Sequence, residues 1–315
     1  MVIRFYDFEF NLIHIEPKFV NSSWRIYFND AGTFEAHFPI ESEVSAVVAK
    51  NKYLVAVQGD FSAIITGYDT KEDFAVFGRT CNWILTKRIS LPFEETQSYA
   101  GIIASKVVSG AFSDVGNFYT DTKGLGKVIT FIKDSAATVF EVVTECLNGS
   151  SIGHEVRFDI QNKKWIFRTF KPNETSLIIS EALKNASDTA ITADILDMAD
   201  CGYYTKKTED DEGNTTEELT LLDSGGKSGI YRWEALLSGS SESEAENSLL
   251  TKKENSILTL STHGIFYGED YSLGDTVRVQ ITKGALKRTE KRRISGVEVQ
   301  YRDAAKFEQP VFEEV

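Results

Sequence analysis

The chain has 315 residues, of which 42% are hydrophobic, so it is long enough for two or three folded domains and too apolar for a disordered protein. Its 34 basic and 47 acidic residues give a net charge of −13, which argues against a nucleic-acid reader because phosphate binding requires a basic surface. The 21 Phe and 12 Tyr, against only 5 Pro, favour β structure.

The three cysteines, Cys81, Cys146 and Cys201, are far apart and form no CxxC pair. This spacing predicts reduced, structural thiols in a protein made in the cytosol. No apolar run reaches 18 residues, and Met1–Arg4 resembles the start of a strand. We therefore expect neither a membrane segment nor a signal peptide.

Residues 1–90 predict a first β-barrel domain, because apolar and polar residues alternate and turn residues separate the runs. Asn29–Gly32 marks one such turn, and Pro39 ends the strand that follows it. A short helix is expected at 44–49, and the expected strands lie at 3–10, 24–28, 34–38, 54–57, 61–66 and 74–77.

Residues 91–190 predict a smaller domain that combines helices with a hairpin. Apolar residues recur at helical spacing in 98–108 and 139–147. Asp134-Ser135 is expected to cap the second helix and Gly149 to end it. A hairpin is expected from strands at 156–160 and 165–170.

Residues 191–315 predict a second β-barrel domain with C-terminal strands. The acidic stretch 208–218 indicates an exposed hairpin tip, and the Ser- and Glu-rich stretch 238–246 indicates the start of a helix that reaches Leu250. The expected strands lie at 230–236, 257–260, 276–281 and 294–301. The predicted fold class is thus mainly β, with two β-barrels around an α+β insertion.

No motif predicts catalysis, a cofactor or a metal. Gly225–Ser228 ends like a phosphate-binding loop, but Leu221 stands where that motif requires glycine. The four histidines lack the spacing of zinc ligands, and Ser109-Gly110 and Ser224-Gly225 lack the preceding glycine that a G-x-S-x-G elbow requires.

A concentration of positive charge occupies residues 283–293. Its side chains either dock an acidic surface on a neighbouring subunit or belong to a solvated hairpin, and the sequence leaves both interpretations open. The possible interface residues are Lys287, Arg288, Arg292 and Arg293.

Three stretches carry a family resemblance in a fixed order. The first is GTFEAHFP, with Gly32, Phe34 and Pro39; the second is GRTCNWILTKR, with Gly78, Arg79 and Arg88. The third is LGDTVRV, which contains Leu273, Gly274 and Asp275. Together they resemble the tail-hub proteins of bacteriophages and prophages, including siphovirus-type tail proteins, and of phage tail-like bacteriocins.

The resemblance implies a structural role in the virion tail, in a protein made in the host bacterial cytoplasm. It implies two barrels related to the tail-tube fold and a homotrimeric ring that adapts a hexameric tube to a trimeric spike or tip. The implied partners are a tail-tube or distal tail protein and a spike or tail-tip protein, and DNA would meet the chain only in transit. The alternative is a tail-tip protein that binds cell-surface carbohydrate or hydrolyses the cell wall.

Specific roles follow for the resemblance residues. Arg79 and Arg88 are expected to be packing or interface residues. Leu273 should be buried, Gly274 should permit a tight turn, and Asp275 should pin that turn through hydrogen bonds to the backbone.

Overall fold

The computed structural model describes residues 2–209, 215–223, 225–302 and 305–314. The chain divides into two compact units. Unit 1 comprises Met1–Thr189 and Leu260–Val315, and unit 2 comprises Ala190–Thr259. The predicted segments 1–90, 91–190 and 191–315 divide the chain differently, because the C-terminal strands lie in the same unit as the first residues.

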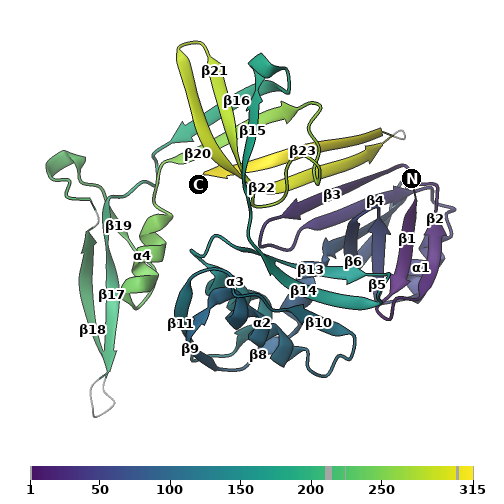
Figure 1. The fold of residues 1–315 in the computed structure, drawn as a ribbon, viewed down its shortest axis with the longest axis horizontal. Coiled ribbons are helices and arrows are strands. Elements are labelled where there is room, and N and C mark those ends of the chain that lie inside the picture. The colour runs from purple at the N-terminus through teal and green to yellow at the C-terminus, as the bar shows by residue number, and fades with distance from the viewer. Residues whose placement is uncertain (1, 210–214, 224, 303–304, 315) are drawn as a thin grey trace. The chain divides into compact units, whose positions relative to one another are not determined.

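Unit 1 is built on a large sheet, in which Figure 1 shows C-terminal strands running beside N-terminal ones. Among the described residues the sheet has eleven strands, in the order β15-β21-β22-β3-β4-β7-β6-β5-β1-β2, with β23 also paired to β22. The strands are β1 (Ile3–Asp7), β2 (Leu12–Glu16), β3 (Asn21–Tyr27), β4 (Thr33–Phe38), β5 (Leu54–Gln58), β6 (Phe61–Thr70), β7 (Phe74–Thr80), β15 (Glu174–Ser180), β21 (Thr276–Lys283), β22 (Leu286–Arg302) and β23 (Ala305–Glu314).

Alternation of side chains explains why these strands form. In β4, Phe34, Ala36 and Phe38 are buried, whereas Glu35 is exposed. Trp24 on β3 packs against Phe34, with ring centroids 4.3 Å apart, and its indole N–H donates to the buried amide oxygen of Gln58. A short helix, α1 (Val44–Lys50), lies where the sequence predicts one.

The long strand β22 joins the two β blocks that the sequence predicts as separate barrels. Its first half pairs with β21 along 286–293, and its second half pairs with β3 along 296–302. The mainly β class is therefore confirmed. The described strands form no closed barrel, so the two-barrel arrangement stays a prediction.

The α+β part of unit 1 packs two helices against a small sheet of order β10-β14-β13. Its elements are the 3₁₀ helix η1 (Cys81–Lys87), β8 (Ile89–Ser90), β9 (Phe93–Tyr99), α2 (Ala100–Ala111), β10 (Phe118–Asp121), β11 (Val128–Lys133), β12 (Ala137–Thr138), α3 (Val139–Leu147), β13 (Gly153–Asp159) and β14 (Lys164–Phe170). β9 pairs with β11, and β8 pairs with β12.

The predicted cap of the second helix is wrong by one turn. Thr138, rather than Asp134 or Ser135, caps α3: its hydroxyl accepts from the N–H of Glu141, whose carboxylate accepts from the N–H of Thr138. This reciprocal pairing satisfies two backbone donors at once, which a cap farther upstream cannot do.

Unit 2 is entered and left through a two-stranded ribbon of β16 (Ala186–Asp194) and β20 (Asn255–Thr262), which follows the 3₁₀ helix η2 (Glu181–Leu183). Its own sheet has the order β18-β17-β19. The elements are β17 (Cys201–Glu209), β18 (Thr215–Asp223), the 3₁₀ helix η3 (Gly229–Tyr231), β19 (Glu234–Leu236) and α4 (Glu242–Leu250).

The expected strand at 230–236 is mostly wrong, because only β19 is extended and η3 occupies the start of that stretch. The acidic hairpin is present as β17 and β18, which pair from Cys201–Asp223 to Glu209–Thr215. The predicted tip falls partly on 210–214, outside the described residues.

Candidate functional site

The two N-terminal resemblance motifs meet in one ladder of unit 1. β4 and β7 are antiparallel neighbours in which Phe34 lies opposite Gly78 and Thr33 opposite Arg79. A Cβ atom at Gly78 would lie 2.4 Å from the carbonyl oxygen of Ile64 on β6, so only glycine fits this crossing of strands. Arg79 is exposed on the same strand.

Gly32 and Pro39 bracket β4, and Arg88 lies elsewhere. Gly32 precedes the strand and exchanges hydrogen bonds with Thr80, whereas Pro39 follows the last residue of the strand. The guanidinium of Arg88 lies 3.0 Å from the carboxylate of Asp114 and over the ring of Phe112, at the end of α2. Arg88 therefore packs against the helical part of unit 1.

The C-terminal motif forms a pinned turn before β21. Gly274 has a φ of +82°, and its N–H donates to the carbonyl of Ile294. The carboxylate of Asp275, itself buried, accepts from the backbone N–H groups of Asn173 at 2.7 Å and Ser272 at 2.9 Å. Leu273 is half-buried rather than buried as predicted, because it lines the rim of a cleft.

The basic stretch 283–293 lies on the β21–β22 hairpin, and most of its charges are paired within unit 1. Lys283 pairs with Glu181, Lys291 with Glu174, Arg288 with Glu290 and Arg293 with Glu313. Arg292 is only 1% exposed and pairs with Glu290 and Glu314, so the chain itself encloses this predicted interface residue. Lys287 and Arg288 are exposed.

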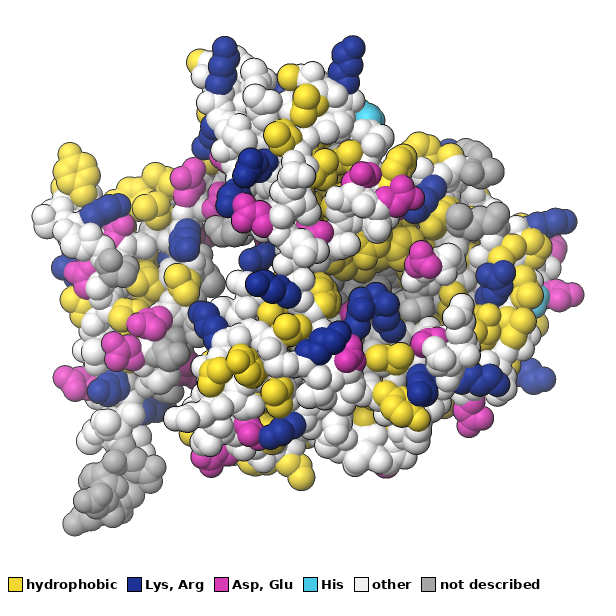
Figure 2. Space-filling model, in the orientation of Figure 1, with side chains coloured by type: hydrophobic (Ala, Val, Ile, Leu, Met, Phe, Trp, Pro, Cys, Tyr) yellow, Lys and Arg dark blue, Asp and Glu magenta, His cyan; other side chains and the backbone are white. Residues whose placement is uncertain are grey.

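A cleft of about 900 Å³ opens in unit 1 between the large sheet and the outer face of β13 and β14. Figure 2 shows Lys and Arg side chains over these strands, next to hydrophobic ones. No local sequence pattern indicates this cleft, because its walls come from segments far apart in the chain. Its aromatic and charged lining residues include Phe28, Asp60, Glu155, Arg157, Arg168, Phe170 and Tyr267.

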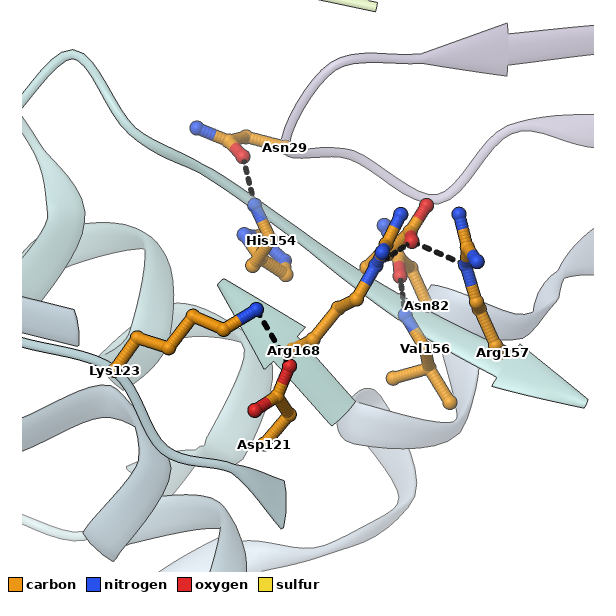
Figure 3. A network of polar contacts seen from close by, with 9 residues as sticks. Asn29, Asn82, Asp121, Lys123, His154, Val156, Arg157 and Arg168 are labelled. Atoms are coloured by element: carbon orange, nitrogen blue, oxygen red, sulfur yellow. Dashed lines mark hydrogen bonds and ion pairs between the residues drawn. The ribbon is translucent and has the colours of Figure 1, made fainter. Parts of the chain in front are cut away.

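Figure 3 shows the polar network along β13. The Glu155 carboxylate accepts from both Arg157 and Arg168, and Asp121 pairs with Lys123 at 2.7 Å. Two asparagines tie β13 to the large sheet: Asn29 accepts from the N–H of His154 at 2.8 Å, and Asn82 accepts from the N–H of Val156 at 2.6 Å. Asn29 and Asn82 thus hold β13 in place. Because Arg157 and Arg168 share the single carboxylate of Glu155, these three side chains carry a net positive charge.

His154 faces the opposite side of β13, into the helical core. It is 1% exposed and packs against the rings of Phe140 and Phe167, and neither of its ring nitrogens has a hydrogen-bond partner among the described residues. Its cross-strand neighbour Thr169 is also buried, with an unpartnered hydroxyl. Burial lowers the pKa of His154 to about 4, so the imidazole is neutral at pH 7.

The cysteines have the properties of structural residues. All three are buried and free. Burial raises the pKa of the Cys81 and Cys146 thiols to about 12, so both stay protonated and poorly nucleophilic. Within the part of the chain that the structure describes, no three His, Cys, Asp or Glu side chains gather in a metal-binding geometry, and no helix is long and apolar enough to span a membrane.

The sequence model of the siphovirus ReqiPepy6 Gp37-like proteins matches residues 2–218. The chain belongs to this family. No curated protein sequence matches the chain.

Three solved structures share the fold over nearly their whole length. The 43 kDa tail protein of prophage MuSo2 from Shewanella oneidensis is 11% identical with a TM-score of 0.64, covering 100% of this chain and 98% of that one. A tail protein from Neisseria meningitidis MC58 is 10% identical with a TM-score of 0.60, covering 99% and 96%. Prophage tail protein gp18 from Listeria monocytogenes EGD-e is 11% identical with a TM-score of 0.59, covering 99% and 94%. The predicted resemblance to phage tail proteins is confirmed.

Proposed function

We propose that the chain is a structural tail component that acts as a hub at the baseplate or tail tip of a phage or prophage particle. There it adapts a hexameric tail tube to a trimeric spike or tip and surrounds the DNA channel. The observation that carries the proposal is the match of prophage tail proteins to the entire chain. The proposal assigns no catalytic activity, cofactor or metal to the chain.

The ends of the large sheet suit contacts between copies. β2 is the outermost strand at one end, and its Leu12, Ile13 and Ile15 side chains are exposed. At the other end, the outer backbone of β15 is partly occupied, because the Asn185 side chain bonds both Ser180 and Ile178. An apolar, uncovered edge such as β2 favours pairing with another chain. Different surfaces at the two ends permit a head-to-tail ring.

The first test counts copies in the particle. Electron microscopy of purified particles is expected to show three copies in a ring with a central channel. The paired changes Ile13→Lys and Ile15→Lys should reduce incorporation into tails while the isolated protein stays folded, because both side chains are already exposed. Val128→Lys with Ile132→Lys on β11, likewise exposed, is the matched control. One, two or six copies would contradict the trimer.

The second test concerns charge beside the channel. Because basic side chains would retain the phosphates of passing DNA, we expect acidic groups to dominate the lumen and the hairpin 283–293 to face a protein neighbour or solvent. The variant Lys287→Ala, Arg288→Ala, Arg293→Ala omits the buried Arg292 and should stay folded, since the Arg288–Glu290 and Arg293–Glu313 pairs are partly exposed and such pairs contribute only about 0–1 kcal/mol each. Tail assembly and DNA ejection are measured separately. Normal assembly with altered ejection would place the hairpin in the channel and overturn this arrangement.

One observation favours a second candidate function, recognition of cell-surface carbohydrate. The 900 Å³ cleft combines the rings of Phe28, Phe170 and Tyr267 with the charged groups of β13 and β14. Aromatic faces beside fixed polar groups are typical of small-ligand sites. If the protein is present as a single copy in particles and binds glycans through this cleft, carbohydrate recognition is favoured over the hub role.

A further inference from the structure

Unit 2 carries an apolar row across one face of its sheet. Tyr203 on the central strand β17 lies opposite Leu221 of β18 in the antiparallel ladder and opposite Leu236 of β19 in the parallel ladder. Directly opposed residues project from the same face of a sheet. Leu219, opposite Thr205, extends the row by one more side chain. We define Tyr203, Leu219, Leu221 and Leu236 as the open face.

Helix α4 of unit 2 covers the other face. Tyr204, whose side chain points opposite to that of Tyr203, forms a small core with Ala245 and Leu249 of α4. Figure 1 shows α4 against one side of this sheet. On the open face Leu236 is 81% exposed, Leu219 62% and Leu221 40%. Contiguous exposed apolar side chains of this kind mark a surface that another molecule covers.

The net charge of unit 2 indicates which kind of molecule can cover the open face. Residues 190–259 contain 15 acidic and 6 basic residues, a net charge of −9 out of the −13 of the whole chain. Three of the six basic residues are paired with acids of the same unit: Lys207 with Glu217, Lys227 with Asp200 and Arg232 with Glu234. Asp223 and Glu234 stand beside the apolar row, on the strands that carry Leu221 and Leu236.

We propose that the open face docks a different protein whose apolar side chains are bordered by lysines and arginines. Two units of charge −9 repel each other, so a second copy of unit 2 is a poor occupant, and nucleic acid is repelled for the same reason. The inference rests on the proposed function, since the partner is met in the tail.

The experiment uses a single reactive cysteine. The three native cysteines are buried, so Leu236→Cys in the full chain introduces the one exposed thiol among the described residues. Leu250→Cys at the end of α4, 59% exposed, is the matched control. Cys-specific labelling with a maleimide is expected to be at least about tenfold slower at position 236 in assembled particles than in the isolated protein, because interface cores exclude solvent. The rate at position 250 should not change.

A maleimide–benzophenone on the position-236 thiol then identifies the neighbour by photocrosslinking and mass spectrometry. The expected product joins the chain to another tail protein at a site flanked by Lys or Arg. A crosslink to a second copy, equal labelling rates in particles and isolated protein, or protection already in the isolated protein would each overturn the proposal. If the chain is absent from particles altogether, the proposed function fails instead, so the two failures are distinguishable.

Discussion

Gly274→Val is expected to lower the free energy of unfolding of unit 1 through backbone strain and steric overlap together. A side chain at φ +82° costs about 1–3 kcal/mol in backbone strain. The new Cβ would also lie 2.4 Å from the Phe28 ring and 2.7 Å from Pro172, and overpacking of this kind adds about 1–3 kcal/mol. Calorimetry, which can resolve separate transitions of the two units, measures the loss.

Gly284→Val separates the two causes. Gly284 also has a positive φ, +57°, but a Cβ atom added there would have no described atom within 4 Å beyond Gly284 itself and its two chain neighbours. This control should show the backbone strain without the overlap, and so a smaller loss of stability. An unchanged melting temperature for Gly274→Val would show that the Leu273–Asp275 turn does not support the fold.

Acidification from pH 7 to pH 4 is expected to destabilise unit 1 through His154. The unfolded chain binds this proton near pH 6.5 and the folded chain only near pH 4, so the unfolded state gains protons first as the pH falls. A pKa difference of this size corresponds to about 3 kcal/mol in the free energy of unfolding, which is lost as the pH falls from 6.5 to 4. Urea unfolding at several pH values measures it.

His154→Leu is the variant that tests this cause. The ring nitrogens make no hydrogen bond to any residue that the structure describes, so their removal leaves no new donor or acceptor unpaired. The variant should therefore lose part of the acid sensitivity. His37 acts in the opposite direction: burial disfavours its charge, but hydrogen bonds to Asp73 and Glu35 outweigh burial and raise its pKa. His37→Gln should therefore steepen the acid loss. Equal pH profiles for wild type and His154→Leu would contradict the prediction.

Local sequence patterns predicted where the helices and strands lie better than they predicted which strands pair with each other. Alternation located β4 and the β13–β14 hairpin, because each buries one face within a few residues. The β3–β22 pairing joins residues nearly the whole chain apart, such as Trp24 and Val299, and no local pattern encodes that register. In the sequence, the charged first half of β22 resembles a solvated hairpin, because the distant acidic partners of its basic residues are not part of any local pattern.

The strand β23 and the cleft beside β13 could not be predicted from local sequence patterns. β23 contains Pro310, which usually argues against a strand. Among the described strands β23 pairs only with β22, and an edge position tolerates a residue without an N–H. The cleft depends on Asn29 and Asn82, which look like ordinary turn residues until their side chains are seen bonded to β13. In the sequence, His154 is one of four histidines without metal-ligand spacing, and it precedes the expected strand 156–160 by two residues.

Because β16 and β20 form a two-stranded ribbon, unit 2 is an insertion that can be replaced as a whole. Because the chain departs and returns on adjacent strands, the segment could be swapped for another, or for a turn of about two to five residues, without altering the register of the large sheet. Under the proposed function, changes in the surface of unit 2 and changes in the large sheet of unit 1 can then be selected separately. Under the same proposal, one recombination event that exchanges this segment would change the partner of unit 2 and leave the strands of the large sheet as they are.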